Sequence, residues 1–112
     1  MDVSFATSKL QKLCNNSTKM VSEVGARDAE RLKQRLLEMR RVATLRELEL
    51  LPATGCHPLK GNRRGEWAVY LAHPRRLIFL PDHEPLPVLS DGGLDTSRVT
   101  RVVIIEVGVD YH

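Results

Sequence analysis

The N-terminal part of the chain begins with an alternating pattern and then changes to a helical one. Residues 1–7 (MDVSFAT) place apolar side chains at alternate positions, which predicts a short strand. A helix is expected over residues 8–16, where apolar residues recur at helical spacing and Thr7 or Ser8 supplies the N-cap. The adjacent asparagines at its end predict that this helix ends or bends there.

The longest periodic segment covers residues 27–51 (RDAERLKQRLLEMRRVATLRELELL) and predicts an amphipathic helix, with a second amphipathic piece that closes at Pro52. Asp28 lies near its start, where a carboxylate suits the helix dipole. The apolar stripe consists of Ala29, Leu32, Leu36, Met39 and Val42 or Ala43. The basic residues expected mainly outside the stripe are Arg31, Lys33, Arg35, Arg40 and Arg41. They form either a solvated face or a surface for phosphate or an acidic partner.

From residue 66 onward the pattern changes to that of strands. EWAVYL (66–71) alternates, and RLIFL (76–80) follows after a turn at Pro74. RVVIIEVGV (101–109) is apolar enough for a central strand. Residues 81–100 are rich in Pro, Gly and Asp, which predicts a protruding excursion.

These elements predict a single α+β domain over residues 1–112. We expect the N-terminal strand and two to three helices to pack on one face of a small antiparallel sheet. A hydrophobic content of 42% and a charged content of 28% suit a globular protein. Because only 4% of residues are aromatic, Trp67 and Phe79 are expected in the core and not as platforms that stack on nucleobases.

Charge is distributed unevenly along the chain, although the formal net charge is only +3. Residues 1–65 hold 13 Lys/Arg against 7 Asp/Glu, a balance of +6, whereas residues 66–112 hold 4 against 7, a balance of −3. A basic N-terminal part favours a polyanion or an acidic partner. Cys14 and Cys56 lack metal-binding spacing and are expected to be free thiols. With no signal-peptide pattern and no membrane-spanning segment, a cytoplasmic protein without a membrane partner is expected.

Chemically active residues gather first at the end of the last strand, in VDYH. By simple alternation, the even-numbered residues of 102–112 share one face, so Asp110 and His112 emerge together on the less apolar surface. Tyr111 points the other way unless Gly108 opens a bulge. A carboxylate beside an imidazole is a competent proton-transfer pair. This end is therefore a candidate catalytic segment.

The second gathering is CHPLKGNRRGEW, which presents His57 and Lys60 and then Arg63 and Arg64 between two glycines. An imidazole and several cations beside a strand favour an anion site. The alternative is a polar turn in which His57 satisfies a backbone group. Arg76, at the head of a strand, suits phosphate because its guanidinium donates bidentately, although an edge-strand charge is the competing interpretation.

No metal signature, glycine-rich nucleotide loop or GxSxG motif occurs, and neither a metal nor a cofactor is expected. His73 and His83 are expected to satisfy backbone groups in turns. The remaining His, Asp, Tyr, Lys and Arg residues suit RNA cleavage in which the 2′-hydroxyl is the nucleophile. A base removes its proton, an acid protonates the leaving 5′-oxygen, and cations stabilise the phosphorane.

Four segments in order, HPLKGNRRGEWAVYL, RRLIFLP, GGLDTSRVTRVVIIEV and the closing DYH, resemble the HigB branch of the RelE/ParE toxin superfamily. The resemblance runs from the long helix to the last residue, and residues 1–26 share only the general layout. It implies the RelE/ParE-like fold and a metal-independent endoribonuclease that cuts mRNA in the ribosomal A site. It also implies a HigA-like helix-turn-helix antitoxin as partner, with operator DNA contacted only through the toxin–antitoxin complex.

The resemblance also assigns roles by position. The predicted catalytic residues are His57, Asp110, Tyr111 and His112, with the two histidines as base and acid in an order that the sequence leaves open. Lys60 and Arg76 are expected to stabilise the phosphate. The loop at Arg63 and Arg64 would add salt-sensitive RNA contacts. Residues 81–100 depart from the family members that shorten this segment greatly.

Two alternatives stay open at this point. A ParE-like protein of the same fold would inhibit gyrase by protein–protein contact and would not need the histidines. A catalytically inactive domain would bind the antitoxin and act with it as a co-repressor. The joint presence of His57 and the DYH end favours the nuclease.

Overall fold

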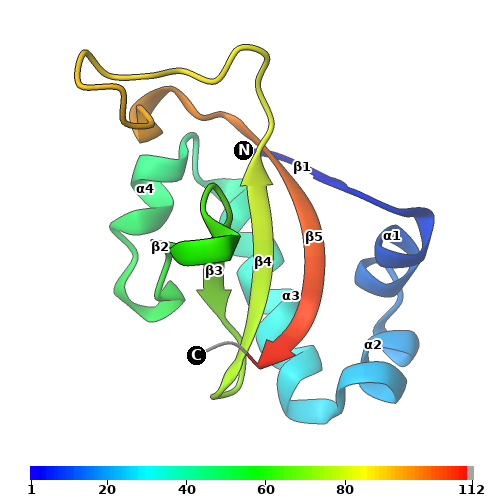
Figure 1. Cartoon of the computed structure of the whole chain (residues 1–112). Helices are drawn as coiled ribbons and strands as arrows, with labels where there is room; N and C mark the ends of the chain where they lie inside the picture. Colours follow the sequence, from blue (N-terminus) through cyan, green and yellow to red (C-terminus); the bar gives the residue numbers. More distant parts are fainter. Residues whose placement is uncertain (111–112) are drawn as a thin grey trace.

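The computed structural model describes residues 1–110 and has the α+β composition that the sequence predicts (Figure 1). The strands are β1 (Asp2–Phe5), β2 (His57–Pro58), β3 (Trp67–Tyr70), β4 (Arg75–Pro81) and β5 (Arg101–Asp110). The α-helices are α1 (Ser8–Cys14), α2 (Ser17–Val24), α3 (Ala26–Arg41) and α4 (Leu45–Glu49). Short 3-10 helices cover Pro52–Thr54 (η1), Gly61–Arg63 (η2) and Thr96–Arg98 (η3).

The strands form one sheet in the order β1-β5-β4-β3-β2. The predicted antiparallel run is confirmed for β3, β4 and β5, but the sheet as a whole is mixed because β1 pairs with β5 in parallel. The helices between β1 and β2 carry the chain across one face of the sheet, so that β1 and β5 can enter it in the same direction. The two-residue strand β2 was not predicted.

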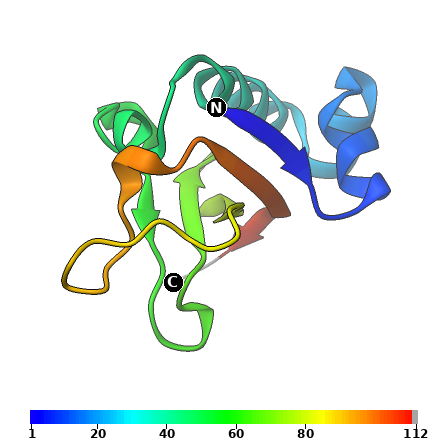
Figure 2. The ribbon, with the colours of Figure 1, turned by 90° about the horizontal axis from the view of Figure 1, so that it is seen from above.

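The helices and the main core lie on one face of the sheet, as predicted (Figure 2). Leu32 and Met39 of α3 are fully buried in the same cluster as Phe79 and Ile104 of the sheet. The predicted spacing of the α3 stripe is thereby confirmed. On the other face, which we call the open face, a smaller cluster contains Leu59, Ala68 and Ile78, with Ile105 and Val109 packed against it.

The breaks between helices follow from side-chain caps. Thr7 Oγ1 accepts from the backbone NH of Leu10 (3.1 Å), which confirms a predicted cap. Asn16 Oδ1 accepts from the NH of Lys19 (2.9 Å) and starts α2, so the predicted break at the asparagine pair is also confirmed. Thr44 caps α4 in the same way and separates it from α3. Within residues 1–110, no helix has both the length and the apolarity needed to cross a bilayer.

The last strand departs from the simple alternation predicted for it. The β4–β5 register pairs Phe79 with Ile104 but Ile78 with Glu106, and Leu77 with Val107 but Arg76 with Val109. One extra residue in β5 enters at each shift, and the second is Gly108, whose φ is +80°.

The two bulges change which side chains share a face. The even-numbered Val102 and Ile104 are fully buried on the helix side, whereas Glu106 reaches Arg63 on the open face. The single-face prediction for the even-numbered residues was therefore wrong, while the bulge considered at Gly108 is confirmed.

Residues 82–100, which we call the arm, form the predicted protruding excursion (Figure 1). The arm is internally bonded: the NH of Asp95 donates to Pro87 O (2.9 Å) and the NH of Leu89 donates to Gly93 O (2.7 Å). At its return, His83 Nε2 accepts from the NH of Thr100 (3.0 Å), which confirms the backbone role predicted for this histidine.

Candidate functional site on the open face of the sheet

His57 lies in β2 opposite Ala68, whose buried side chain belongs to the open-face cluster. Its Nδ1 is 2.7 Å from the carbonyl oxygen of Gly55, so Nδ1–H donates to this oxygen. In the neutral ring, Nε2 is then the basic nitrogen, and in the protonated ring Nε2 is a proton donor. The backbone contact weighed as an alternative for His57 is therefore present, and it fixes the orientation of the ring.

Tyr70 is a member of this site that the sequence analysis did not single out. Its ring centroid lies 6.2 Å from that of His57, and the guanidinium carbon of Arg76 lies 4.5 Å from the Tyr70 centroid. Tyr70 and Arg76 are directly opposite in the β3–β4 register. The available signal was the alternation in EWAVYL, which places Tyr70 on the side away from the buried Trp67 and Val69.

A glycine makes room for the Tyr70 ring. Gly55 has a φ of +58°, and a Cβ built on it would lie 2.1 Å from Cε2 of Tyr70. Any side chain at this position would collide with the ring, because real Cβ atoms do not approach ring carbons so closely. Gly55 thus serves the site twice, through its carbonyl to His57 and through the space left for Tyr70.

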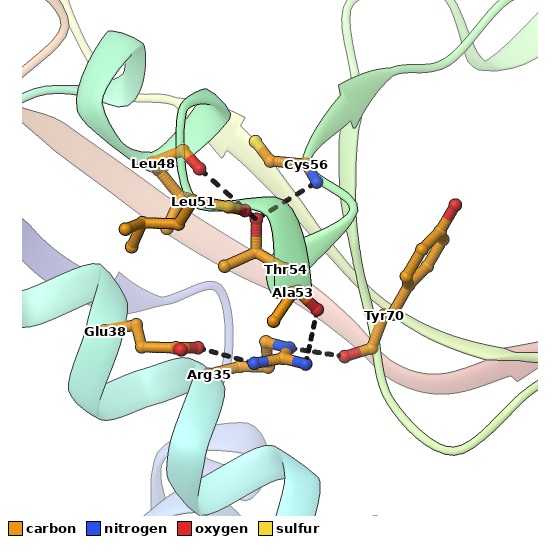
Figure 3. A network of polar contacts seen from close by, with 8 residues as sticks. All are labelled: Arg35, Glu38, Leu48, Leu51, Ala53, Thr54, Cys56 and Tyr70. Atoms are coloured by element: carbon orange, nitrogen blue, oxygen red, sulfur yellow. Dashed lines mark hydrogen bonds and ion pairs between the residues drawn. The ribbon is translucent and has the colours of Figure 1, made fainter.

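A buried arginine anchors the backbone beneath the ring (Figure 3). Arg35 is only 2% exposed, and its Nε donates to Tyr70 O (2.8 Å) while its Nη2 donates to Ala53 O (2.7 Å). Its charge is paired with Glu38 at 2.6 Å. The prediction that Arg35 lies outside the buried stripe was wrong. The reason is that two carbonyl groups from later parts of the chain need donors at this position.

Thr54 fixes the segment that leads into His57 (Figure 3). Its hydroxyl donates to carbonyl oxygens of Leu48 (3.2 Å) and Leu51 (2.9 Å), and its oxygen accepts from the NH of Cys56 (3.2 Å). Thr54 is fully buried. The positions of Gly55 and His57 are therefore set by a packed turn after α4 and not by a mobile loop.

Backbone carbonyl groups of the β3–β4 hairpin bind the side chain of Arg76. Arg76 Nη1 donates to the carbonyl oxygens of Pro74 (2.7 Å) and Arg75 (3.2 Å). Asp28 of α3, only 4% exposed, accepts from the NH of Ala72 (2.8 Å) and pairs with Arg75 at 3.2 Å. The predicted position of Asp28 near the helix start is confirmed, and its carboxylate connects α3 to this hairpin.

The basic side chains of the CHPLKGNRRGEW loop have different surroundings. Arg63 contacts two carboxylates, those of Glu106 (2.7 Å) and Glu66. These hydrogen bonds, with Glu106 first, raise the pKa of Arg63 above its ordinary value. Arg64 is exposed and lines a groove of about 660 Å³ beside α4 and the arm. Lys60 is exposed next to the buried Leu59 of the open face.

Asp110 is exposed at the end of β5, directly opposite Arg75, while Val109 is opposite Arg76. Residues directly opposite in an antiparallel pair project to the same side. Asp110 therefore shares the side of Arg75, which reaches toward α3, and not the side of Arg76. Tyr111 and His112 lie outside the described residues, and the roles predicted for them stay predictions.

The described part of the chain holds no group of three or more His, Cys, Asp or Glu residues that could bind a metal ion. It brings together His57 and Arg76, with Tyr70 between them. The chain matches none of the protein-family models and none of the curated proteins with which it was compared. The residues of this site therefore carry the functional argument.

Proposed function

We propose that this protein is a HigB-like toxin with the RelE/ParE fold that cleaves mRNA on the ribosome by metal-independent phosphodiester chemistry. The observation that supports the proposal best is the constellation of His57, Tyr70 and Arg76 on the open face, where the apolar cluster includes no α-helical residue from the described part of the chain. The imidazole supplies one of the two proton-transfer groups that in-line attack by a 2′-hydroxyl needs, and the guanidinium supplies a cation for the phosphate. Segments carrying these residues are also among those that resemble the family.

In the proposed reaction, one general base takes the proton of the 2′-hydroxyl, and the 2′-oxygen attacks phosphorus. The bond from phosphorus to the 5′-oxygen breaks, and a general acid protonates that oxygen. The products are a 2′,3′-cyclic phosphate and a 5′-hydroxyl. His57 suits either role because its Nδ1–H is committed to Gly55, which leaves Nε2 to accept or give the proton. His112 is proposed for the complementary role, and Tyr111 and Asp110, which lies on the side of Arg75, are proposed as further catalytic residues.

Negative charge on the phosphorane needs preorganised cations. Arg76 has a fixed guanidinium, because the Tyr70 ring and the Pro74 carbonyl both contact it. Lys60 is proposed as the second phosphate contact. Arg63 and Arg64 are proposed as further RNA contacts, although RNA at Arg63 must compete with Glu66 and Glu106. A HigA-like antitoxin is the proposed partner and the route to operator DNA.

Expression of the wild type in a bacterial host tests the proposal. We expect growth arrest and mRNA cut within translated frames, whereas His57→Ala and His112→Ala should give neither. Growth arrest with intact mRNA in these variants would support the gyrase-inhibiting alternative. A wild type that leaves both growth and mRNA unaffected would support the inactive co-repressor.

A further inference from the structure

Tyr70 is unusual among the aromatic residues of this chain because its ring is exposed. Within residues 1–110, the other Phe, Trp and Tyr side chains are buried or partly buried, whereas Tyr70 is 42% exposed. A single exposed ring is ordinary by itself, but the Tyr70 ring is held in place and its centroid lies 4.5 Å from the guanidinium carbon of Arg76. The position of the ring is fixed, because Gly55 lies against the ring and Arg35 binds the backbone carbonyl oxygen of Tyr70.

A depression of about 310 Å³ opens beside this ring, and we call it the hairpin depression. Its lining residues are Tyr70, Leu71, His73 and Arg76. Leu71 is buried and apolar, whereas the other three carry planar π systems. The volume is at the lower end of the range for small-molecule sites, about 300–1,000 Å³. A lining of planar side chains suits a flat heterocycle, because aromatic rings and guanidinium planes stack on such rings.

The charges around the depression indicate which chemical group would be attached to a bound heterocycle. Arg76 contributes a cation whose Nη1 contacts carbonyl groups of the hairpin. The nearest carboxylate from α3, that of Asp28, is engaged by Arg75 and by the NH of Ala72. A planar aromatic group next to a positive charge suits a nucleobase attached to a phosphate. Arginine and aromatic side chains stack on unpaired bases with little regard to sequence.

We propose that the hairpin depression is a nucleobase subsite for single-stranded RNA, with Tyr70 as its specificity-determining ring. This inference rests on the proposed function, since it places the base next to a phosphate held by Arg76. Tyr70 has a positioning role here: it contacts the base and fixes the Arg76 guanidinium. The subsite distinguishes a base from an empty sugar and selects unpaired RNA, because a stacked base pair cannot enter the depression.

The experiment compares two oligonucleotides with the same 2′-O-methyl backbone, which lacks the nucleophile and therefore cannot be cleaved. One carries all its bases and the other is abasic. We expect the wild type to bind the base-bearing strand roughly five- to 150-fold more tightly, the range for stacking one base. Tyr70→Leu should bring this ratio close to one, while Tyr70→Phe, which keeps the ring, should preserve it. His73→Ala should lower the ratio partly.

Val88→Ala is the matched control, because it removes an exposed apolar side chain on the arm. An unchanged ratio in Tyr70→Leu would overturn the proposal, as would a failure of the wild type to bind the base-bearing strand at millimolar concentration. If the wild type bound an aromatic peptide but neither oligonucleotide, the depression would be a site for a protein partner, and this result would also overturn the proposal. If the wild type cleaved translated mRNA but bound the two oligonucleotides equally well, the subsite alone would be refuted. If the wild type preferred the base-bearing oligonucleotide but did not cleave translated mRNA, the proposed function would be refuted and the subsite would still be supported.

Discussion

Gly55 shows how a single residue sets the geometry of the site. Its positive φ turns the chain so that its carbonyl meets His57, and its missing side chain admits the Tyr70 ring. Both effects depend on the same position. Replacement of Gly55 therefore tests whether the ring arrangement matters for activity.

Gly55→Ala should lower mRNA cleavage by at least about tenfold, because displacement of a catalytic group by about 1 Å often costs about a hundredfold. Gly61→Ala is the control: its φ of +65° is similar, but nothing lies within 4 Å of an added Cβ. Both variants should lose about 1–2 kcal/mol of stability from left-handed strain, and Gly55→Ala should lose more because its Cβ also collides with the Tyr70 ring. Equal cleavage rates for the two variants would show that the ring position is irrelevant.

The two cysteines should react slowly in the folded protein. Burial raises the pKa of Cys14 to about 11 and of Cys56 to about 12; Arg40 opposes the effect at Cys14, and Glu49 adds to it at Cys56. The thiolate is the reactive form, so alkylation at pH 8 should be much slower in native than in urea-unfolded protein. The native rate should keep rising above pH 9, where that of the unfolded chain levels off.

The same shifts have a defined effect on stability. Above about pH 9 the unfolded chain loses thiol protons that the folded protein retains, so these groups make stability fall as the pH rises toward 11–12. Native and unfolded alkylation rates that agree at pH 8 would contradict the burial of Cys14 and the partial burial of Cys56.

The sequence identified some residues of the site by their type, but it did not predict the surroundings of each side chain. His57 and Arg76 were identified from the sequence and do come together. Tyr70 and Arg35 were missed because their roles depend on backbone groups far away in the chain, at Gly55, Ala53 and the end of β3. Helical periodicity reports which positions face a neighbour, and it does not report whether that neighbour offers carbonyl oxygens.

At the scale of elements, Arg35 connects three pieces of the fold. It projects from α3 and binds a carbonyl of η1 and the last carbonyl of β3, with Glu38 as its counter-charge (Figure 3). A buried charge that loses a partner is costly, and so are buried carbonyls that lose a donor. Arg35 therefore stabilises both the fold and the floor of the site.

Arg35→Met should lower the free energy of unfolding by about 3–5 kcal/mol, as removal of one member of a buried ion pair does. Arg31→Met, on the exposed side of the same helix, should change it by about 0.5 kcal/mol or less. Urea denaturation of both variants measures the difference. Similar losses for the two would mean that the network contributes little.

The limits of prediction at this scale are clearest in β5. Its apolar sequence and its central position were predictable, but side-chain parity was not, because two bulges intervene. Gly108 signalled the second bulge, since glycine in a strand often marks one. The first has no comparable signal, because Ile105 is an ordinary strand residue and its displacement depends on the register with β4.

For the whole molecule, the division of the sheet into two faces is the organising feature. The α-helices lie on one face (Figures 1 and 2), together with the main core, and the open face carries a small apolar cluster. His57, Tyr70 and Arg76 belong to the strands of this sheet. In the proposed function, the RNA approaches this open face, which is built from strands and packed turns. The predicted α+β class anticipated this layering, because helices that precede a set of strands cover a single face.

The most direct test of the central claim is an analysis of RNA ends after mRNA is translated in the presence of purified protein. Proposed attack by the 2′-hydroxyl predicts new 2′,3′-cyclic phosphate and 5′-hydroxyl ends with the wild type, and their loss in His57→Ala. Ends that carry a 5′-phosphate, or equal cleavage by His57→Ala, would contradict it.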